Sequence, residues 1–195
     1  YGEDFVFTRE PGGVALAEAL RLVIKSDNGM SSDAITQFLM FWAARSAWVK
    51  QFVVPMLSHE TVVFSDRGDS STYAYQVCAK KESDVRLERE FWRMRDLVFC
   101  GSDPSAYFIV DVPAEEARRR SLTASDGEHT TVFDLAELSF YQEVRQGFLS
   151  FAKEVCLPTG NSSSKPVVKI IDGARTPEVI HEEIYALVCD LCGWK

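Results

Sequence analysis

The fold is decided by the stretch Val62-Val63-Phe64-Ser65-Asp66-Arg67-Gly68-Asp69-Ser70-Ser71-Thr72-Tyr73-Ala74-Tyr75-Gln76. A short apolar run leads directly into an acid and a base, Asp66 and Arg67, and then into a hydroxyl-rich turn. Such a run is typical of a buried strand whose end presents both side chains to a ligand. In open α/β sheets ligands bind at the carboxyl ends of strands, and a carboxylate beside a guanidinium suits a metal-bound phosphate. The segment therefore points to phosphoryl chemistry.

Four short apolar runs alternate with long helix-patterned stretches, which predicts a parallel α/β sheet with crossover helices. The predicted strands are residues 5–7, 61–65, 107–112 and 167–171. The predicted helices are residues 15–25, 33–57, 72–98, 114–121, 134–156 and 176–192. Helix starts are indicated by Ser32-Asp33, by Asp134 and by Thr176-Pro177, because these residue types favour N-cap and N1 positions.

Length and composition indicate one well-cored domain, because the chain has 195 residues and is 46% hydrophobic. A net charge of -8 argues against non-specific nucleic-acid binding, although an acidic protein can still gather arginines in one anion pocket. No run approaches the ~18 apolar residues of a membrane span, and no signal-peptide pattern is visible. We therefore expect a cytoplasmic protein that binds neither nucleic acid nor membrane.

The five cysteines form an odd set without the dense spacing of a disulfide scaffold, which favours reduced thiols in the cytoplasm. Cys189 and Cys192 make a formal CxxC at the end of an apolar-periodic helix. Because no second such pair accompanies them, we favour a packing role over a zinc or redox site.

A second segment, Arg9-Glu10-Pro11-Gly12-Gly13, follows the first predicted strand. Two glycines after a proline allow a tight turn whose backbone amides can face a ligand, and Arg9 can donate two hydrogen bonds to a phosphate. On its own, Pro-Gly-Gly would indicate only a turn. Its position at a strand end, together with Asp66-Arg67 at another, favours a phosphate site.

A third feature is the pair Phe41 and Arg45, which lie four residues apart on one face of a predicted helix. An aromatic ring and a guanidinium placed in this way can converge on a small planar ligand, by stacking and by hydrogen bonds to a carbonyl. The alternative is that Phe41 belongs to the core and Arg45 pairs with a carboxylate. The spacing alone leaves both possibilities open.

In this order, the three elements resemble the thymidylate kinase family. The family pattern has Arg-Glu-Pro-Gly-Gly after a strand, then Phe-x-x-x-Arg in a helix, then Asp-Arg with a Ser/Thr-rich turn closing on Ala-Tyr-Gln. The likeness covers essentially the whole chain and continues through residues 107–116, 144–149 and 171–174. It implies a three-layer P-loop kinase fold, a parallel sheet flanked by helices, which transfers the γ-phosphoryl of ATP to dTMP and forms dTDP. ATP and Mg²⁺ are the implied cofactors, and a homodimer through helices such as Phe38–Trp48 is the implied assembly.

The resemblance also implies roles for single residues at the acceptor phosphate. Arg9 and Arg67 would hold the 5′-phosphate of dTMP. Asp66 would lie near the magnesium ion and contact it through water.

Five further residues are implied in binding the nucleoside. Phe41 would stack on thymine and Arg45 would donate to a ring carbonyl. Ser71 and Gln76 would approach the base. Tyr75 would lie by the deoxyribose, where crowding can exclude a 2′-hydroxyl.

The chain departs from the family pattern on the donor side, because no G-x-x-x-x-G-K-[ST] motif occurs in it. We therefore expect that residues 1–195 lack the family's first strand, P-loop and first helix. In the lid segment, residues 121–134, Val132 stands where arginine is expected. Charge stabilisation of the transferred phosphoryl would then come from the P-loop or from lid candidates that precede the segment, namely Arg118, Arg119 and Arg120. The alternative is that these three arginines form the solvated surface of an acidic helix.

Two alternatives to a strict dTMP kinase stay open. Gly68 replaces an aromatic residue that often follows Asp-Arg in the family, which allows a broader deoxynucleoside monophosphate kinase. An inactive nucleotide-binding module would result if the P-loop were truly absent.

Overall fold

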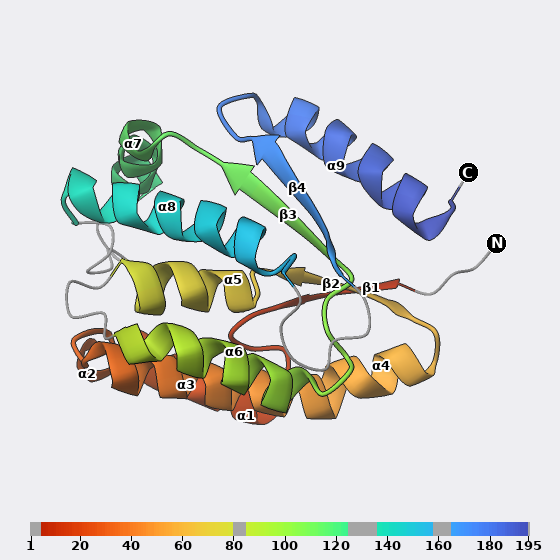
Figure 1. Ribbon diagram of the computed structural model, residues 1–195, viewed down its shortest axis with the longest axis horizontal. Helices are drawn as coiled ribbons and strands as arrows, with labels where there is room; N and C mark the ends of the chain where they lie inside the picture. Colours follow the sequence, from red (N-terminus) through yellow and green to blue (C-terminus); the bar gives the residue numbers. More distant parts are fainter. Residues whose placement is uncertain (1–4, 80–84, 125–135, 158–164, 195) are drawn as a thin grey trace.

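The strands of the protein are parallel and lie between helices. The computed structural model describes residues 5–79, 85–124, 136–157 and 165–194. Its strands are β1 (Phe5–Arg9), β2 (Val62–Asp66), β3 (Ala106–Asp111) and β4 (Val167–Asp172). In Figure 1 the strands have α9 (Pro177–Cys192) on one side and α3 (Ala34–Trp48) and α6 (Val85–Phe99) on the other. The predicted α/β class is confirmed, and each strand begins and ends within two residues of its prediction.

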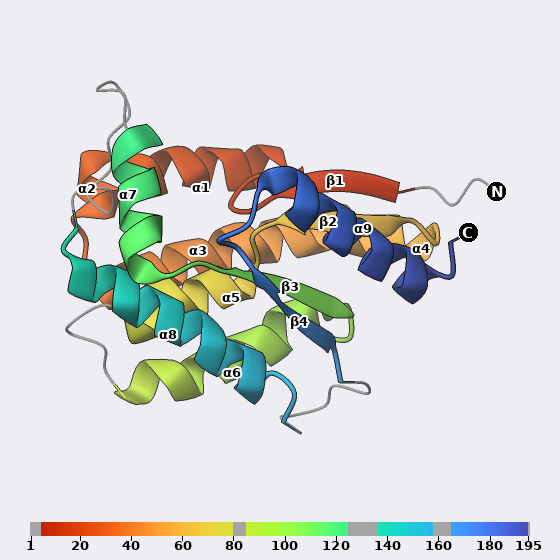
Figure 2. The ribbon, with the colours of Figure 1, turned by 90° about the horizontal axis from the view of Figure 1, so that it is seen from above.

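The strands pair as two separate parallel ladders, β1 with β2 and β3 with β4 (Figure 2). Arg9 stands opposite Asp66 in the first ladder, and Asp111 opposite Asp172 in the second. The sequence predicted a single sheet, whereas within the described residues β2 and β3 each use one edge only for strand pairing. The expectation that residues 1–195 lack the family's first strand, P-loop and first helix stays a prediction.

Helix α1 (Ala15–Lys25) has its predicted bounds, and α3 begins at the predicted cap. The carboxylate of Asp33 accepts hydrogen bonds from the backbone N–H groups of Ile35 and Thr36. The short helix α2 (Asp27–Met30) was not predicted. The side chain of Ser26 stabilises it by accepting from the N–H of Gly29.

The predicted helix of residues 33–57 changes its winding before it ends. After α3 it continues as the π-helix η1 (Val49–Val53) and then as α4 (Val54–Ser58). Pro55 at the start of α4 has no N–H to donate to the preceding turn, and a π-bulge is one way for a helix to accommodate that loss.

The prediction of one helix over residues 72–98 is wrong. The segment comprises α5 (Asp69–Thr72), the π-helix η2 (Tyr73–Cys78), a bend at Ala79, and α6, which begins at Val85. Most residues from Thr72 to Ala79 are buried. The polar run Lys-Lys-Glu-Ser-Asp of residues 80–84 follows, and the prediction of one continuous helix overlooked this interruption of the apolar pattern.

The remaining helices are α7 (Ala114–Ala124), α8 (Leu138–Glu154) and α9. Thr176 and Pro177 occupy the N-cap and N1 positions of α9, as predicted. The predicted cap Asp134 lies outside the described residues, and α8 begins after Glu137. No helix of the described segments is both long enough and apolar enough to cross a bilayer.

The core lies on the helical side, where aromatic rings of α3, η2, α6 and α8 meet. Tyr73 and Phe91 have ring centroids 5.0 Å apart, and Phe91 contacts Trp42 at 5.5 Å and Phe151 at 6.2 Å. Burying one such side chain contributes about 1.5–3 kcal/mol. Gly147 lets α8 approach η2 closely, because a Cβ there would lie 2.8 Å from the Cα of Ala74. This packing holds in place the helices that carry the candidate site.

Candidate functional site

The two predicted phosphate segments lie side by side at the carboxyl ends of β1 and β2. Arg9 is the strand partner of Asp66, and the N–H of Glu10 donates to the carbonyl of Asp66 at 3.0 Å. The parallel pairing thus brings the Arg-Glu-Pro-Gly-Gly loop and the Asp-Arg turn to one edge, where α/β proteins bind ligands.

The loop after β1 is held by Glu18, a residue of α1 that the sequence analysis missed. Its Oε1 accepts from Nη2 of Arg9 and from the backbone N–H of Gly13, both at 3.0 Å. Gly12 and Gly13 have φ angles of 144° and 83°, which only glycine adopts without strain. The hydrogen bonds from Gly13 and then from Arg9 lower the pKa of Glu18, so its carboxylate stays ionised. The side chain of Arg9 remains 58% exposed and open to solvent.

Four cations gather around this loop, although the protein carries a net charge of -8. Burial lowers the pKa of Lys25, and the nearby positive charges of Arg21, Arg9 and Arg67 lower it further. Arg21 also donates from Nη1 to the carbonyl of Pro11 at 2.7 Å. Positive charges gathered in this way favour an anion nearby.

Arg21 and Lys25 were not predicted, although a helical pattern could have found them. Glu18, Arg21 and Lys25 are spaced i, i+3 and i+7, so they share one face of α1. That face turns toward the Pro-Gly-Gly loop, as the contacts of Glu18 and Arg21 show.

Arg45 is buried and pairs with Glu10 of the same loop. Its Nε donates to Oε2 of Glu10 at 2.6 Å, and its Nη2 donates to Oγ1 of Thr72 at 3.1 Å. The guanidinium carbon also lies 4.7 Å from the centre of the Trp42 ring. Burial raises the pKa of Glu10 to about 7, against the attraction of Arg45, which lowers it. The carboxylate partner that the sequence analysis left open for Arg45 is thus present.

One donor of Arg45 is nevertheless unused. Its Nη1 is buried and has no hydrogen-bond partner among the described residues. A buried unsatisfied donor costs about 1–3 kcal/mol, which a ligand carbonyl would relieve.

The other predicted nucleoside contacts lie on α3, α5 and η2. Phe41 is half-buried against the core, and Ser71 is half-buried on α5. Gln76 is buried, and its Nε2 lies 3.4 Å from Oε1 of Gln37. The ring of Tyr75 packs edge-on against Phe140 of α8 at 6.0 Å. The bond from Arg45 to Thr72 ties α3 to α5, so the helices that carry these side chains are held together.

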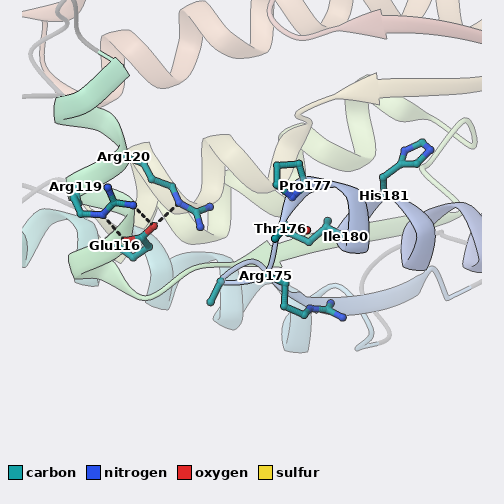
Figure 3. Close-up of a pocket in the computed structure, with 9 residues that line it drawn as sticks. Glu116, Arg119, Arg120, Arg175, Thr176, Pro177, Ile180 and His181 are labelled. Carbon is teal, nitrogen blue, oxygen red and sulfur yellow. Dashed lines mark hydrogen bonds and ion pairs between the residues drawn. The ribbon is translucent and has the colours of Figure 1, made fainter.

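A cavity of about 710 Å³ lies between α7 and the start of α9. Figure 3 shows Arg119 and Arg120 converging on Glu116 at one side of it, with Thr176 and His181 at the other. Each arginine is 2.7 Å from Glu116, and their hydrogen bonds lower the pKa of Glu116 to about 2. The volume lies in the range of small-molecule sites.

Only two of the three candidate arginines that precede the lid line this cavity. Arg119 and Arg120 line the cavity, whereas Arg118 is exposed on α7 and does not. Arg175, which was not predicted, lines the opposite side. Residues 125–134 of the predicted lid, Val132 among them, lie outside the described residues.

Comparison with known proteins decides the family. A family model described as thymidylate kinase matches residues 1–184 of the 195. The chain belongs to the thymidylate kinase family. A thymidylate kinase of Acinetobacter baylyi is 32% identical over 187 residues, which cover 93% of this chain and 82% of that protein. A thymidylate kinase of Nitratidesulfovibrio vulgaris is 29% identical over 194 residues, which cover 96% of this chain and 83% of that protein.

A solved thymidylate kinase structure supports the same assignment. The crystal structure of the thymidylate kinase of Ehrlichia chaffeensis matches with a TM-score of 0.66 and 27% identity, covering 95% of this chain and 80% of that one. The family, the α/β kinase fold and the reaction, phosphorylation of dTMP to dTDP, are as the sequence indicated. The family uses ATP.

Proposed function

We propose that Arg9 and Arg67 bind the 5′-phosphate of dTMP, assisted by Arg21 and Lys25. The observation that carries this proposal is the strand pairing that sets Arg9 opposite Asp66, the neighbour of Arg67. Burial, and then the positive charges of Arg21, Arg9 and Arg67, lower the pKa of Lys25, which agrees with a concentration of positive charge there. A phosphate dianion would offset that charge and accept charge-assisted hydrogen bonds from the guanidinium groups. The position at the ends of β1 and β2 also supports it.

The thymine base would be held by Arg45 and Phe41. The unpartnered Nη1 of Arg45 matches a ring carbonyl, and Glu10 and Thr72 fix the guanidinium in place. Phe41 lies one helical turn earlier and supplies an aromatic face. Gln76 and Ser71 would contact the edge of the base, and Tyr75 would lie by the deoxyribose.

ATP would enter the cavity between α7 and α9. Arg119, Arg120 and Arg175 give it positive charge that suits the nucleotide phosphates. The described residues hold no cluster of three or more carboxylate, His or Cys side chains, so a Mg²⁺ near Asp66 would be bound largely by phosphate oxygens and water.

In the reaction, an oxygen of the dTMP phosphate attacks the γ-phosphorus of ATP. The bond from that phosphorus to the β–γ bridging oxygen breaks, and ADP carries the electron pair away. Catalysis of this kind depends on positioning and on charge stabilisation, which the arginines would supply.

A broader deoxynucleoside monophosphate kinase is the second candidate, because the acceptor region is open at Gly68. A Cβ added there would meet only Oε1 of Glu10, at 4.0 Å. Turnover of the four deoxynucleoside monophosphates in direct competition separates the two candidates. Strong preference for dTMP supports the roles of Phe41 and Arg45, and equal rates with dGMP would contradict them.

A homodimer would form through α1 and α3. Leu22 and Val23 of α1, with Ile35 and Leu39 of α3, are large apolar side chains that are 47% to 74% exposed. The two helices pack together and share a shallow apolar hollow. The sequence-based choice was the helix that contains Phe38–Trp48, which is α3. Because Phe38, Trp42 and Trp48 face the core, the outward side chains of that helix would form the interface. We place the enzyme in the cytoplasm, as expected from its family.

A further inference from the structure

A buried carboxylate lies just beyond the Asp-Arg pair. Asp69 is the first residue of α5 and is 0% exposed. It accepts hydrogen bonds from Nε of Arg95 at 2.9 Å and from the hydroxyl of Tyr107 at 2.9 Å and 3.1 Å.

The network joins parts of the chain that strand pairing leaves separate. Asp69 follows β2, Tyr107 belongs to β3 of the other ladder, and Arg95 comes from α6. Arg95 is anchored further by Asp103, whose Oδ1 lies 2.6 Å from Nη1. Burial, and then the charge of Asp69, raise the pKa of Tyr107, so its hydroxyl stays protonated and can donate.

Between β2 and Asp69 the backbone takes an uncommon shape. Arg67 has a φ angle of 71°, in the left-handed region that side chains with a Cβ rarely adopt. Such a conformation persists when the surrounding structure holds it from both sides. Upstream the carbonyl of Asp66 accepts from the N–H of Glu10, and downstream the chain is fixed at Asp69.

We propose that Asp69 is a positioning residue for the acceptor phosphate: through Arg95 and Tyr107 it fixes the backbone that holds the guanidinium of Arg67. The proposal rests on the role proposed for Arg67. Asp69 itself contacts no substrate, because its carboxylate is fully buried and used by Arg95, Tyr107 and the N–H of Ser70.

The test compares two ligands that differ only in the phosphate. Dissociation constants for dTMP and for thymidine are measured by calorimetry on the full chain and its variants. Asp69→Asn keeps the volume of the side chain and removes its charge. We expect it to raise the dissociation constant of dTMP by about tenfold and to change that of thymidine by no more than about twofold. Asp96→Asn, an exposed aspartate on α6, is the matched control and should change neither value.

A double variant separates positioning from a general structural effect. In an Arg67→Ala background, Asp69→Asn should cause no further loss of dTMP affinity, because the group that it positions is gone. Equal weakening of dTMP and thymidine, or an undiminished loss in the Arg67→Ala background, would overturn the proposal. An unchanged dTMP affinity in Arg67→Ala alone would instead refute the proposed role of Arg67.

Tyr107→Phe covers the case in which Asp69→Asn does not fold. It removes the hydroxyl that donates to Asp69 and accepts from Nη2 of Arg95 at 3.3 Å, and it keeps the ring that packs on Phe151 at 5.0 Å. We expect a few-fold loss of affinity for dTMP and none for thymidine, on the order of the contribution of a hydrogen bond. No change in dTMP affinity, with the fold intact by circular dichroism, would count against the proposal.

Discussion

The guanidinium Nε of Arg45 lies 2.6 Å from Oε2 of Glu10, and both side chains are buried. The pair joins the loop after β1 to the middle of α3, and so connects the proposed phosphate site to the proposed base site. Removing one member of such a pair leaves an uncompensated buried charge, which is strongly destabilising. Tests of this pair therefore need substitutions that keep hydrogen bonds.

Glu10→Gln should flatten part of the pH dependence of stability. The pKa of Glu10 rises from 4.5 to about 7 on folding, so the folded state binds the proton more tightly between these values. Wild-type stability therefore falls as pH rises from 4.5 to 7, by roughly 3 kcal/mol at most from this group. Urea unfolding across this range measures the slope. Glu182→Gln, an exposed residue of α9, should leave it unchanged, and an unaltered slope in Glu10→Gln would refute the assignment.

Arg45→Lys should raise the KM for dTMP. A lysine ammonium cannot reproduce the fork that serves Glu10, Thr72 and the free position at once. We expect a rise of about 10-fold to 100-fold with little change in the KM for ATP. Steady-state kinetics with Arg93→Lys, an exposed arginine of α6, as control checks this. A folded Arg45→Lys enzyme with unchanged KM for dTMP would remove Arg45 from the base site.

The double variant Arg119→Ala/Arg120→Ala should bind ATP more weakly. Both side chains line the cavity beside α9, so their loss should raise the KM for ATP by about tenfold or more and leave the KM for dTMP unchanged. Arg118→Ala is the matched control, because it lies on the same helix outside the cavity lining. If Arg118→Ala had the larger effect, the cavity would not be the ATP site.

The proposed dimer surface predicts a change in mass. Leu22→Asp with Leu39→Asp places two charges on the apolar surface of α1 and α3, which an interface could not bury without large cost. Light scattering should show wild-type particles of twice the mass of the double variant. Leu191→Asp, on the exposed side of α9, should remain dimeric. A monomeric wild-type protein would contradict the proposal.

Much of the fold could be predicted from local patterns. The strands are short apolar runs, and Asp33 and Thr176 are N-caps whose residue types mark a helix start. The break after Ala79 was missed although residues 80–84, Lys-Lys-Glu-Ser-Asp, are all polar, because the apolar pattern resumes beyond them. The separation of the ladders depends on pairing between distant strands, which periodicity does not encode.

The candidate site was predictable only for residues within motifs. The position directly after predicted strands indicated Arg9, Asp66 and Arg67 as candidate site residues. The pairing of buried side chains could not be predicted, because Glu10 and Arg45 are 35 residues apart and Asp69 and Tyr107 are 38 apart. Such contacts arise from tertiary packing, so no local pattern marks them.

The central claim is that Arg67 binds the acceptor phosphate, and the kcat/KM for dTMP of Arg67→Ala tests it most directly. Arg67 is exposed, so its removal should leave the thermal unfolding curve unchanged. We predict that kcat/KM falls by about 10²-fold to 10³-fold or more, while Arg93→Ala, exposed on α6, stays near wild type. A folded Arg67→Ala enzyme with near wild-type kcat/KM would contradict the account.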